Sequence, residues 1–481
     1  MNHYPSKDES EFFDKISVAL LTFIASVYSF DANATAAFSR QTGESCATCH
    51  MQGYGPWLTE YGTKFKLDGY VAGDAAKVPT LLNNFSAEIV SSVTNVASAV
   101  PQGTYIQNSK YTSNAQTNVL NDWDSIYYTG RVLPKVGVYF QINFTPQTSR
   151  NISLSMADMR FADHLNFEGH NVQYGITANN APTMSDTWMT SFAWMYPYTT
   201  SSAAVAPNAT PWLQQLMASP TSVGMTAYTK IDNHWYFEAG GYTNQSITMG
   251  QGFGQAMNLG ANDAIVGGAG YWRVYWDQVF GAHHIMFGSY GLTGNVAPNI
   301  AGQIPGQNYS VATTGTSSKQ EVNLDSNYYY MMDDKNMLMV MWRYTHDNIK
   351  NAAYLQTNNK VNASDNLNNN MLMGMWTYDK TYNLAFSWNH QWGTADMGLY
   401  NNGSPITGSA NGSPNSNSFL VEVDYIPFGK GTFFMDPYFN MRLSLQYWAY
   451  TQFNGATTNY DGYGRSAGQN NTTYFVTNIN F

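Results

Sequence analysis

Charged residues are scarce in this chain of 481 residues, since Asp, Glu, Lys and Arg make up 11% of it, against roughly 25% in an ordinary soluble domain. There is no basic stripe of the kind that binds nucleic acid. No Ser-His-Asp pattern and no Gly-rich phosphate loop is present, so the sequence predicts neither a hydrolase triad nor a nucleotide site. After residue 36, no stretch approaches the about 20 apolar residues that a membrane-spanning helix needs.

Aromatic and uncharged polar residues take the place of the missing charges. The chain has 35 Tyr, 25 Phe and 13 Trp, which argues against disorder, because disordered chains have few aromatics and many charges. This composition suits a sheet that contacts lipid on one face and water on the other. In strong acid the carboxylates become neutral and only 22 Lys and Arg and 9 His repel one another, so the chain is compatible with an acidic exterior.

The beginning of the chain has the features of an export signal. An apolar stretch from 16 to 30 follows a mixed-charge start, and residues 32–34 and 34–36 offer cleavage sites of the A-x-A type. The apolar stretch is shorter than a membrane-spanning helix requires. We therefore predict a signal peptide over residues 1–36.

Cysteine is nearly absent, and both cysteines fall in one motif. They stand in the run Cys46-Ala47-Thr48-Cys49-His50, a C-x-x-C-H signature in which two thiols attach to a haem and the histidine binds its iron. Two other interpretations are a redox disulfide, which does not require the histidine, and half of a zinc site, which lacks a second cysteine pair. The motif predicts one covalent haem c, attached to Cys46 and Cys49, with His50 as the proximal iron ligand.

From about residue 85 onward, short segments of alternating polar and apolar residues recur. Tight turns such as 134–135 and 379–380 alternate with long polar loops such as 179–221. The clearest predicted strands are 124–133, 136–145, 222–231, 235–242, 265–276, 321–332, 337–344, 371–378 and 382–392. Eight long loops and seven short turns give 16 antiparallel strands, and the last strand closes on Phe481, as in many outer-membrane barrels.

Soluble β folds fit this length poorly. A β-sandwich of about 400 residues would be split into several domains, and no linker is visible. A propeller would repeat one motif about every 40–50 residues, and no motif recurs. The sequence therefore predicts a mostly β fold, a 16-stranded antiparallel outer-membrane β-barrel over residues 81–481, with lipid as its outer contact.

The predicted haem-binding segment, residues 37–80, is too small to enclose a haem with a core of its own. A barrel of about 16 strands has a lumen that can hold such a segment. We therefore expect a small helical segment that plugs the lumen from the periplasmic mouth. Its Met51 is adjacent to His50 and cannot reach across the ring, so the barrel wall would supply any sixth iron ligand.

Candidates for that ligand lie on two successive predicted strands. Met156, Asp158 and Arg160 alternate on one strand and therefore share a face. If that face points inward, Met156 could bind the iron and Arg160 could pair with a haem propionate. His170, on the following strand, is the second candidate ligand. The alternative interpretation is a lumenal ion pair between Asp158 and Arg160.

His283 and His284 offer a further pair of metal-binding side chains. They are adjacent in a predicted strand, so they point to opposite faces and cannot chelate one metal together. We expect one of them in the lumen and the other at the lipid interface.

A longer signature surrounds the C-x-x-C-H motif. It consists of residues 37–43, followed after the motif by Pro56, Leu58-Thr59, Tyr61-Gly62, Phe65-Lys66 and Gly69-Tyr70. The signature resembles the P-x-L-T-x-F-G-x-x-F-K-x-x-G-Y run of the outer-membrane fused cytochrome c–porins that oxidise ferrous iron in iron-oxidising bacteria. Tyr61 stands where that family usually has Phe, and Thr63 where Arg is frequent. Residues 179–188 are similar to the N-x-P-T-x-x-D-x-W signature of the family's barrel.

That resemblance implies a monohaem electron conduit, an iron oxidase of the outer membrane. Extracellular Fe(II) would give one electron to the haem, and a periplasmic c-type cytochrome or a rusticyanin-like blue-copper protein would collect it. No catalytic residue beyond the haem site is implied. Two other functions stay open from the sequence: a general diffusion porin with an appended cytochrome, and a conduit that carries electrons outward.

Overall fold

The computed structural model describes residues 36–73, 81–100, 105–106, 109–110, 116–145, 151–190, 201–218, 222–244, 264–297, 315–358, 360–401, 403–436 and 438–481. The predicted signal peptide, apart from Ala36, lies outside the described residues, and so do residues 74–80 of the predicted haem-binding segment. Among the helices of the described residues, none is long and apolar enough to cross a membrane.

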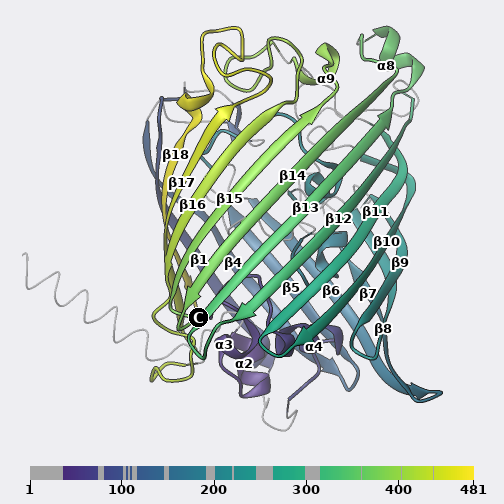
Figure 1. Ribbon diagram of the computed structural model, residues 1–481, viewed down its shortest axis with the longest axis vertical. Coiled ribbons are helices and arrows are strands. Elements are labelled where there is room, and N and C mark those ends of the chain that lie inside the picture. Colours follow the sequence, from purple (N-terminus) through teal and green to yellow (C-terminus); the bar gives the residue numbers. More distant parts are fainter. Residues whose placement is uncertain are drawn as a thin grey trace, which may run out of the picture.

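Sixteen antiparallel strands close into one barrel, with β1 paired to β18. Closure leaves no strand edge open for pairing with another chain. Long loops lie at one end and mostly tight turns at the other (Figure 1), and we call these the long-loop end and the short-turn end. The barrel strands are β1 Phe85–Val96, β4 Thr117–Leu133, β5 Val136–Thr145, β6 Asn151–Phe167, β7 His170–Asn179, β8 Ser222–Ile231, β9 Trp235–Asn244, β10 Ala264–Phe280, β11 His283–Ala297, β12 Ser317–Met331, β13 Asn336–Lys350, β14 Ser364–Tyr378, β15 Tyr382–Gly393, β16 Ser416–Tyr425, β17 Asn440–Gln452 and β18 Thr472–Asn480. A small ribbon in the loop after β1 pairs β2 Tyr105–Ile106 with β3 Ser109–Lys110.

The alternation along the strands places mostly apolar side chains outside and many polar ones in the lumen. In β16, Phe419, Val421 and Val423 are exposed on the outer face, whereas Glu422 and Asp424 are almost fully buried in the lumen. A soluble sheet would turn its charges outward, so this pattern fits a wall that contacts lipid. The predicted fold class is confirmed: the chain forms a closed 16-stranded antiparallel β-barrel of the outer-membrane type.

The predicted strands are found where they were expected, but several continue farther toward the long-loop end. Residues 136–145 and 222–231 coincide with β5 and β8. By contrast, β14 begins at Ser364 rather than at residue 371, because its Asn-rich start still pairs in register with β13. Asparagine is depleted in strands in general, so propensity hid this extension.

One connection at the short-turn end is long, and the prediction of a seventh short turn is wrong there. Residues 426–439 join β16 to β17. Phe428 and Phe433 stack in this connection with ring centroids 4.1 Å apart. The connection also contacts the N-terminal helices, which gives it a reason to be longer than a turn.

Three short helices lie at the short-turn end (Figure 1, purple): α2 Ala36–Thr42, α3 Cys46–Cys49 and α4 Glu60–Leu67. We call residues 36–73 the helical segment. Its Met51, Trp57 and Leu67 pack in one buried cluster with inward-facing barrel residues, so the segment occupies the lumen at this end. The other described helices lie in connections and are η3 Leu81–Asn84, η4 Pro182–Met184, α5 Trp212–Ala218, α8 Ala353–Asn358, α9 Met397–Tyr400 and η5 Ala467–Asn470.

The barrel wall beside the helical segment is built of thioethers. Six inward-facing methionines of β13 and β14 are at most 4% exposed: Met337, Met339, Met341, Met371, Met373 and Met375. Gln52 of the helical segment donates a hydrogen bond to the Met375 sulfur (2.8 Å). Methionine side chains are flexible and fill irregular gaps. This wall therefore fits the uneven surface of short helices to a regular sheet.

The loop between β7 and β8 folds into the lumen, although residues 179–221 were expected to form an outer loop. We call residues 182–190 the inserted segment. Its Trp188 packs on Tyr275 and Tyr329 of the barrel wall, with ring centroids 6.1 and 5.5 Å apart. Farther along the loop, Trp212 of α5 is fully buried in a second cluster of wall residues. Apolar contact with the wall draws both parts of the loop inward.

Candidate functional site

Cys46 and Cys49 lie one helical turn apart on α3 and therefore face the same side. His50 follows in an extended conformation, and its backbone N–H donates to the Cys46 carbonyl (2.9 Å). All three side chains line one cavity that is open at its mouth. The two thiols and the imidazole therefore face a common space, as attachment and ligation of one cofactor require.

The turn that carries the motif packs directly against α4. The Thr59 backbone N–H donates to the Cys49 carbonyl (2.9 Å), and the Thr59 hydroxyl donates to the Thr48 carbonyl (2.5 Å). Gly62 lies against the same Cys49 carbonyl, and a Cβ at position 62 would stand 2.2 Å from its oxygen. Only glycine allows this approach, so Gly62 belongs to the site through its backbone.

Two connections of the barrel hold the motif from the other side. The Ala47 backbone N–H donates to the Gly429 carbonyl (2.9 Å), and the Lys380 ammonium donates to the Ala47 carbonyl. In addition, the Asn440 side-chain amide donates to the Gly53 carbonyl (2.9 Å). The β14–β15 turn and the β16–β17 connection therefore position a motif that precedes them by more than three hundred residues.

Burial changes the titration of the motif side chains. Burial lowers the pKa of His50 to about 4, and the nearby Gly55 backbone offsets this only in part. The His50 Nδ1 atom makes no hydrogen bond of normal geometry. Burial raises the pKa of Cys46, and burial together with the neighbouring Cys46 thiol raises the pKa of Cys49 to about 12. A neutral imidazole is the form that binds a metal. The three side chains therefore fit the thioether and proximal-ligand positions of a haem c.

Much of the longer signature also lines the cavity, and the residues concerned are Pro56, Leu58, Gly62, Phe65, Lys66 and Tyr70. Phe38, another lining residue, stacks on Tyr70 at 5.3 Å and meets Phe65 edge-on at 5.0 Å. Aromatic rings supply a large apolar surface. This part of the wall matches the apolar face of a porphyrin.

The barrel supplies a carboxylate to the cavity wall. Glu88 of β1 accepts hydrogen bonds from the Tyr54 hydroxyl (2.7 Å) and from the Tyr127 hydroxyl (2.5 Å). Both tyrosines line the cavity as well. The carboxylate thus joins the helical segment to β1 and β4.

Lys66 is the one basic side chain among the described residues that line the cavity. It is only 8% exposed, and its ammonium donates to the Asp186 carbonyl of the inserted segment (2.7 Å). Burial lowers the pKa of Lys66 to about 8, with the nearby Arg160 guanidinium adding to the effect. Lys66 still carries a charge at neutral and acidic pH, and it can pair with an acidic group inside the cavity.

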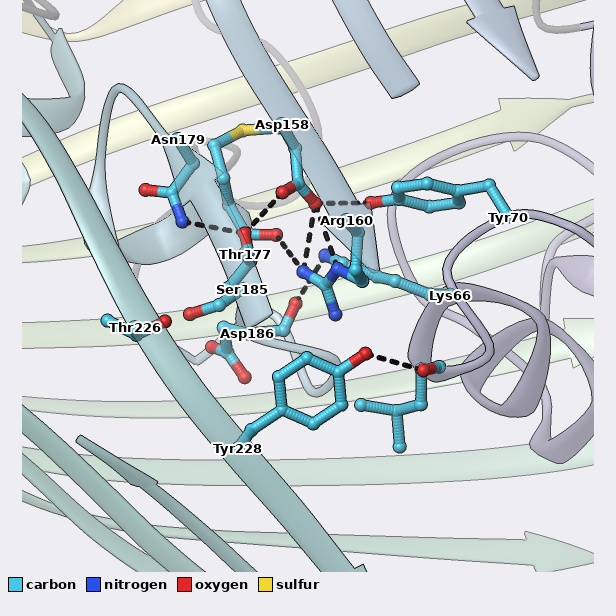
Figure 2. A network of polar contacts seen from close by, with 12 residues as sticks. Lys66, Tyr70, Asp158, Arg160, Thr177, Asn179, Ser185, Asp186, Thr226 and Tyr228 are labelled. Atoms are coloured by element: carbon cyan, nitrogen blue, oxygen red, sulfur yellow. Dashed lines mark hydrogen bonds and ion pairs between the residues drawn. The ribbon is translucent and has the colours of Figure 1, made fainter. Parts of the chain in front are cut away.

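Figure 2 shows the polar network that fastens the helical segment to the barrel. The Tyr70 hydroxyl donates to Asp158 Oδ2 (2.7 Å), and the Arg160 guanidinium forms an ion pair with the same oxygen (2.9 Å). The Tyr228 hydroxyl donates to the Leu67 carbonyl (2.6 Å). Asp158 and Arg160 are fully buried. Removing either partner of a buried ion pair strongly destabilises the folded protein, because the other charge is left without compensation. The network docks the end of the helical segment on β6 and β8.

The role of Arg160 as a propionate partner stays a prediction, and the structure shows Arg160 in another contact. Arg160 pairs with Asp158, and its guanidinium lies 5.2 Å from the centre of the Tyr228 ring. The described residues that line the cavity do not include Arg160. The alternative interpretation, a lumenal ion pair, is what the structure shows.

Neither predicted distal ligand reaches the cavity. Met156 lies opposite Gln141 on the lumenal face, but it stands two strand residues above Asp158, a rise of roughly 7 Å, and it does not line the described cavity. His170 begins β7 at the short-turn end, where its side chain is 63% exposed and its Nδ1 lies 2.6 Å from Asp232 Oδ2. Both ligand roles stay predictions without support from the cavity geometry, although Met156 does share a face with Asp158.

His283 and His284 point to opposite faces, as predicted. The ring of His284 meets Trp188 in the lumen at 5.0 Å, whereas His283 stacks on Tyr330 at 4.6 Å on the outer side. The described residues contain no cluster of three or more His, Cys, Asp or Glu side chains that could hold a metal ion.

Sequence reasoning gave no role to many residues of the cavity wall, among them Lys66, Met184 and Met189. Lys66 belongs to the longer signature, and Met184 lies within the 179–188 signature. These two signatures are the sequence features from which Lys66 and Met184 could have been found. They do not reveal that the inserted segment folds inward and meets the C-x-x-C-H turn.

Comparison with known proteins finds solved structures of low identity. No protein-family model matches the chain, and no curated protein matches it. OprB of Pseudomonas putida is a solved structure with 12% identity and a TM-score of 0.43, and the match covers 89% of this chain and 99% of that chain. The outer membrane channel DcaP of Acinetobacter baumannii has 11% identity and a TM-score of 0.42 over 83% of this chain and 96% of that chain. The strand topology itself shows that this chain is a closed 16-stranded antiparallel β-barrel.

Proposed function

We propose that this barrel carries one covalent haem c and oxidises extracellular Fe(II), passing the electrons to periplasmic carriers. One observation carries the proposal: the two thiols and the imidazole of the C-x-x-C-H motif line a single cavity that the barrel helps to enclose. A porin that conducts solutes has no use for a buried cavity of this composition. The resemblance of residues 37–70 to iron-oxidising cytochrome c–porins supports the same function.

Each residue of the cavity has a defined task in this proposal. Cys46 and Cys49 hold the haem covalently, His50 binds its iron, and Lys66 pairs with a propionate. When bound, haem c supplies one-electron chemistry between the ferrous and ferric states of its iron. The chain itself contributes binding, orientation and exclusion of water.

The surroundings of the cavity favour a high haem potential. Phe38, Leu58 and Phe65 in the cavity wall give the site apolar neighbours. Apolar burial disfavours the more positive, oxidised form of a haem and so raises its potential. A high potential is what an acceptor of electrons from Fe(II) needs.

The position of the helical segment indicates the end of the barrel at which the electron leaves the haem. Short turns of bacterial outer-membrane barrels face the periplasm. The helical segment lies at the short-turn end, and its α4 exposes Tyr61 (39%) and the Lys64 side chain (64%). We infer that a periplasmic c-type cytochrome or rusticyanin-like copper protein approaches on this side.

An anaerobic optical titration of the purified protein with Fe(II) at low pH tests the proposal. We expect one haem to become reduced per chain. His50→Ala should keep the covalent haem and the barrel but lose rapid reduction by Fe(II). The double variant Cys46→Ser/Cys49→Ser should fold as a barrel without haem and without iron oxidation. Iron oxidation at the wild-type rate by that haem-free barrel would refute the proposal.

A general diffusion porin is the second candidate, because the fold is porin-like. It predicts high ion conductance in planar bilayers. The helical segment and the inserted segment both occupy the lumen, so we expect low conductance instead. An outward electron conduit would require a haem potential well below that of the Fe(III)/Fe(II) couple, and redox titration of the purified protein distinguishes it.

A further inference from the structure

The cavity wall contains two thioethers in addition to the C-x-x-C-H motif. Met184 and Met189 both belong to the inserted segment, and both line the cavity together with His50. A methionine sulfur is a common partner of histidine on the iron of c-type cytochromes. It carries no proton to lose, so it remains a ligand at any pH.

Two charged lining groups, a carboxylate and an ammonium, already have partners. The Glu88 carboxylate accepts hydrogen bonds from Tyr54 and Tyr127. The Lys66 ammonium donates to the Asp186 carbonyl, 2.7 Å away. Unlike these two groups, the thioethers of Met184 and Met189 can bind iron without breaking an existing hydrogen bond.

Met184 and Met189 differ in how much of each residue is exposed. Met184 is 6% exposed and so is almost fully enclosed by protein. Met189 is only half-buried, although it belongs to a segment inside the lumen and packs against the cluster that contains Met51 and Trp57. Since Met189 lines the cavity, its accessible surface faces the cavity.

The backbone of Met189 is held in an unfavourable conformation. Its φ is +58°, in the left-handed region that favours glycine. The Asp186 carboxylate imposes this shape, since it accepts hydrogen bonds from the backbone N–H groups of Trp188 and Thr190, each at 2.9 Å. Strained residues of this kind gather at ligand clamps and active sites, where the surrounding structure fixes them.

We propose that the Met189 thioether is the sixth ligand of the haem iron. The inference rests on the proposed function, because it requires a haem on Cys46 and Cys49. It gives the inserted segment a task that its sequence signature alone does not reveal. The barrel then completes the iron coordination that the short helical segment begins.

Spectroscopy of the purified holoprotein tests the assignment. Met189→Leu keeps the volume and removes the sulfur, so it should retain covalent haem in a denaturing gel stained for haem. We expect it to lose the long-wavelength thioether–iron absorption of the ferric state, to show a lower midpoint potential, and to bind added imidazole more tightly. Met189→His should instead give the spectrum of a haem with two imidazole ligands.

Two matched variants control for a general loss of packing. Met184→Leu removes the other lining sulfur, and Met156→Leu removes a lumenal sulfur outside the cavity; both should keep the thioether absorption. The assignment is overturned if Met189→Leu keeps that absorption or if Met184→Leu loses it. Wild-type protein without covalent haem would instead refute the proposed function itself, so the two failures are distinguishable.

Discussion

At the scale of single residues, the site depends on close packing between two backbone segments as well as on the reactive side chains of the motif. The C-x-x-C-H turn and α4 meet where Gly62 lies against the Cys49 carbonyl. Backbone atoms cannot swing aside as a flexible side chain can. The spacing from Cys49 to Gly62 is therefore as much a part of the motif as the two cysteines.

Gly62→Ala should disrupt the helical segment. The added methyl group would stand 2.2 Å from the Cys49 oxygen, so α4 must shift, at a cost of about 1–3 kcal/mol or more. Less covalent haem should be found in purified membranes by haem staining. Thr63→Ala, at the next position of the same helix, is the control. A full haem content in Gly62→Ala would contradict this account of the contact.

Tyr70→Phe should weaken the docking of the helical segment without touching the cavity motif. The change removes one buried hydrogen bond to Asp158, and the carboxylate keeps Arg160 as its partner. We expect the free energy of undocking to fall by about 1–3 kcal/mol. Loss of haem absorbance with increasing urea measures the change. Tyr61→Phe removes a more exposed hydroxyl of the same segment and should have no effect, and an equal shift in both variants would argue against the Asp158 contact.

At the scale of elements, the inserted segment connects the helical segment to the barrel wall. Its Asp186 carbonyl binds Lys66, while the Asp186 carboxylate closes the turn that contains Met189. The Arg273 guanidinium of β10 lies 3.5 Å from that carboxylate. One aspartate thus joins three elements that are far apart in the chain.

Asp186→Ala should loosen the inserted segment. Two backbone N–H groups lose a charged acceptor, and each such hydrogen bond contributes about 1.5–3 kcal/mol. We expect amide hydrogen exchange at residues 187–190 to accelerate at least tenfold, as measured by mass spectrometry. Asp396→Ala removes a similar carboxylate, which caps Gly398 and Leu399 in an outer loop, and it should leave that exchange unchanged. Unchanged exchange in Asp186→Ala would show that other contacts hold the segment.

At the scale of the whole molecule, the helical segment depends on the barrel for its folding more than the barrel depends on the segment. Strand pairing closes the barrel through β1 and β18 without any residue of the helical segment. The segment in turn relies on the barrel for most of its buried surface, because a chain of this length cannot form a core alone. The barrel should therefore fold without the segment, whereas the segment should not fold without the barrel.

Deleting residues 37–73 should convert the molecule into an open pore. Antiparallel strand pairing is retained, so the protein should still migrate as a heat-modifiable barrel. Its conductance in planar bilayers should rise several-fold over the wild type, because the lumen at the short-turn end is vacated. Cys46→Ser/Cys49→Ser keeps the segment and should keep the low conductance. Equal conductance of all three proteins would mean that the segment does not close the lumen.

The sequence alone determined the barrel, its strand number and the C-x-x-C-H turn, because these features depend on short-range patterns. A period of two residues specifies a strand with one lipid face, and three-residue spacing places Cys46 and Cys49 on one side of a helix. The sequence also places Met156 and Asp158 on a common face of one strand. What it lacked was the height of each residue within the barrel, and no residue of β6 lines the described cavity.

Only the tertiary structure decided which residues complete the site. Lys66, Met184 and Met189 reach the cavity because the loop after β7 turns inward and the helical segment docks against it. The same packing assigned Arg160 to Asp158. The contact between Lys66 and Asp186 joins residues 120 positions apart, and no local pattern encodes such contacts. They arise when apolar surfaces of the segment and the loop are buried together in one lumen.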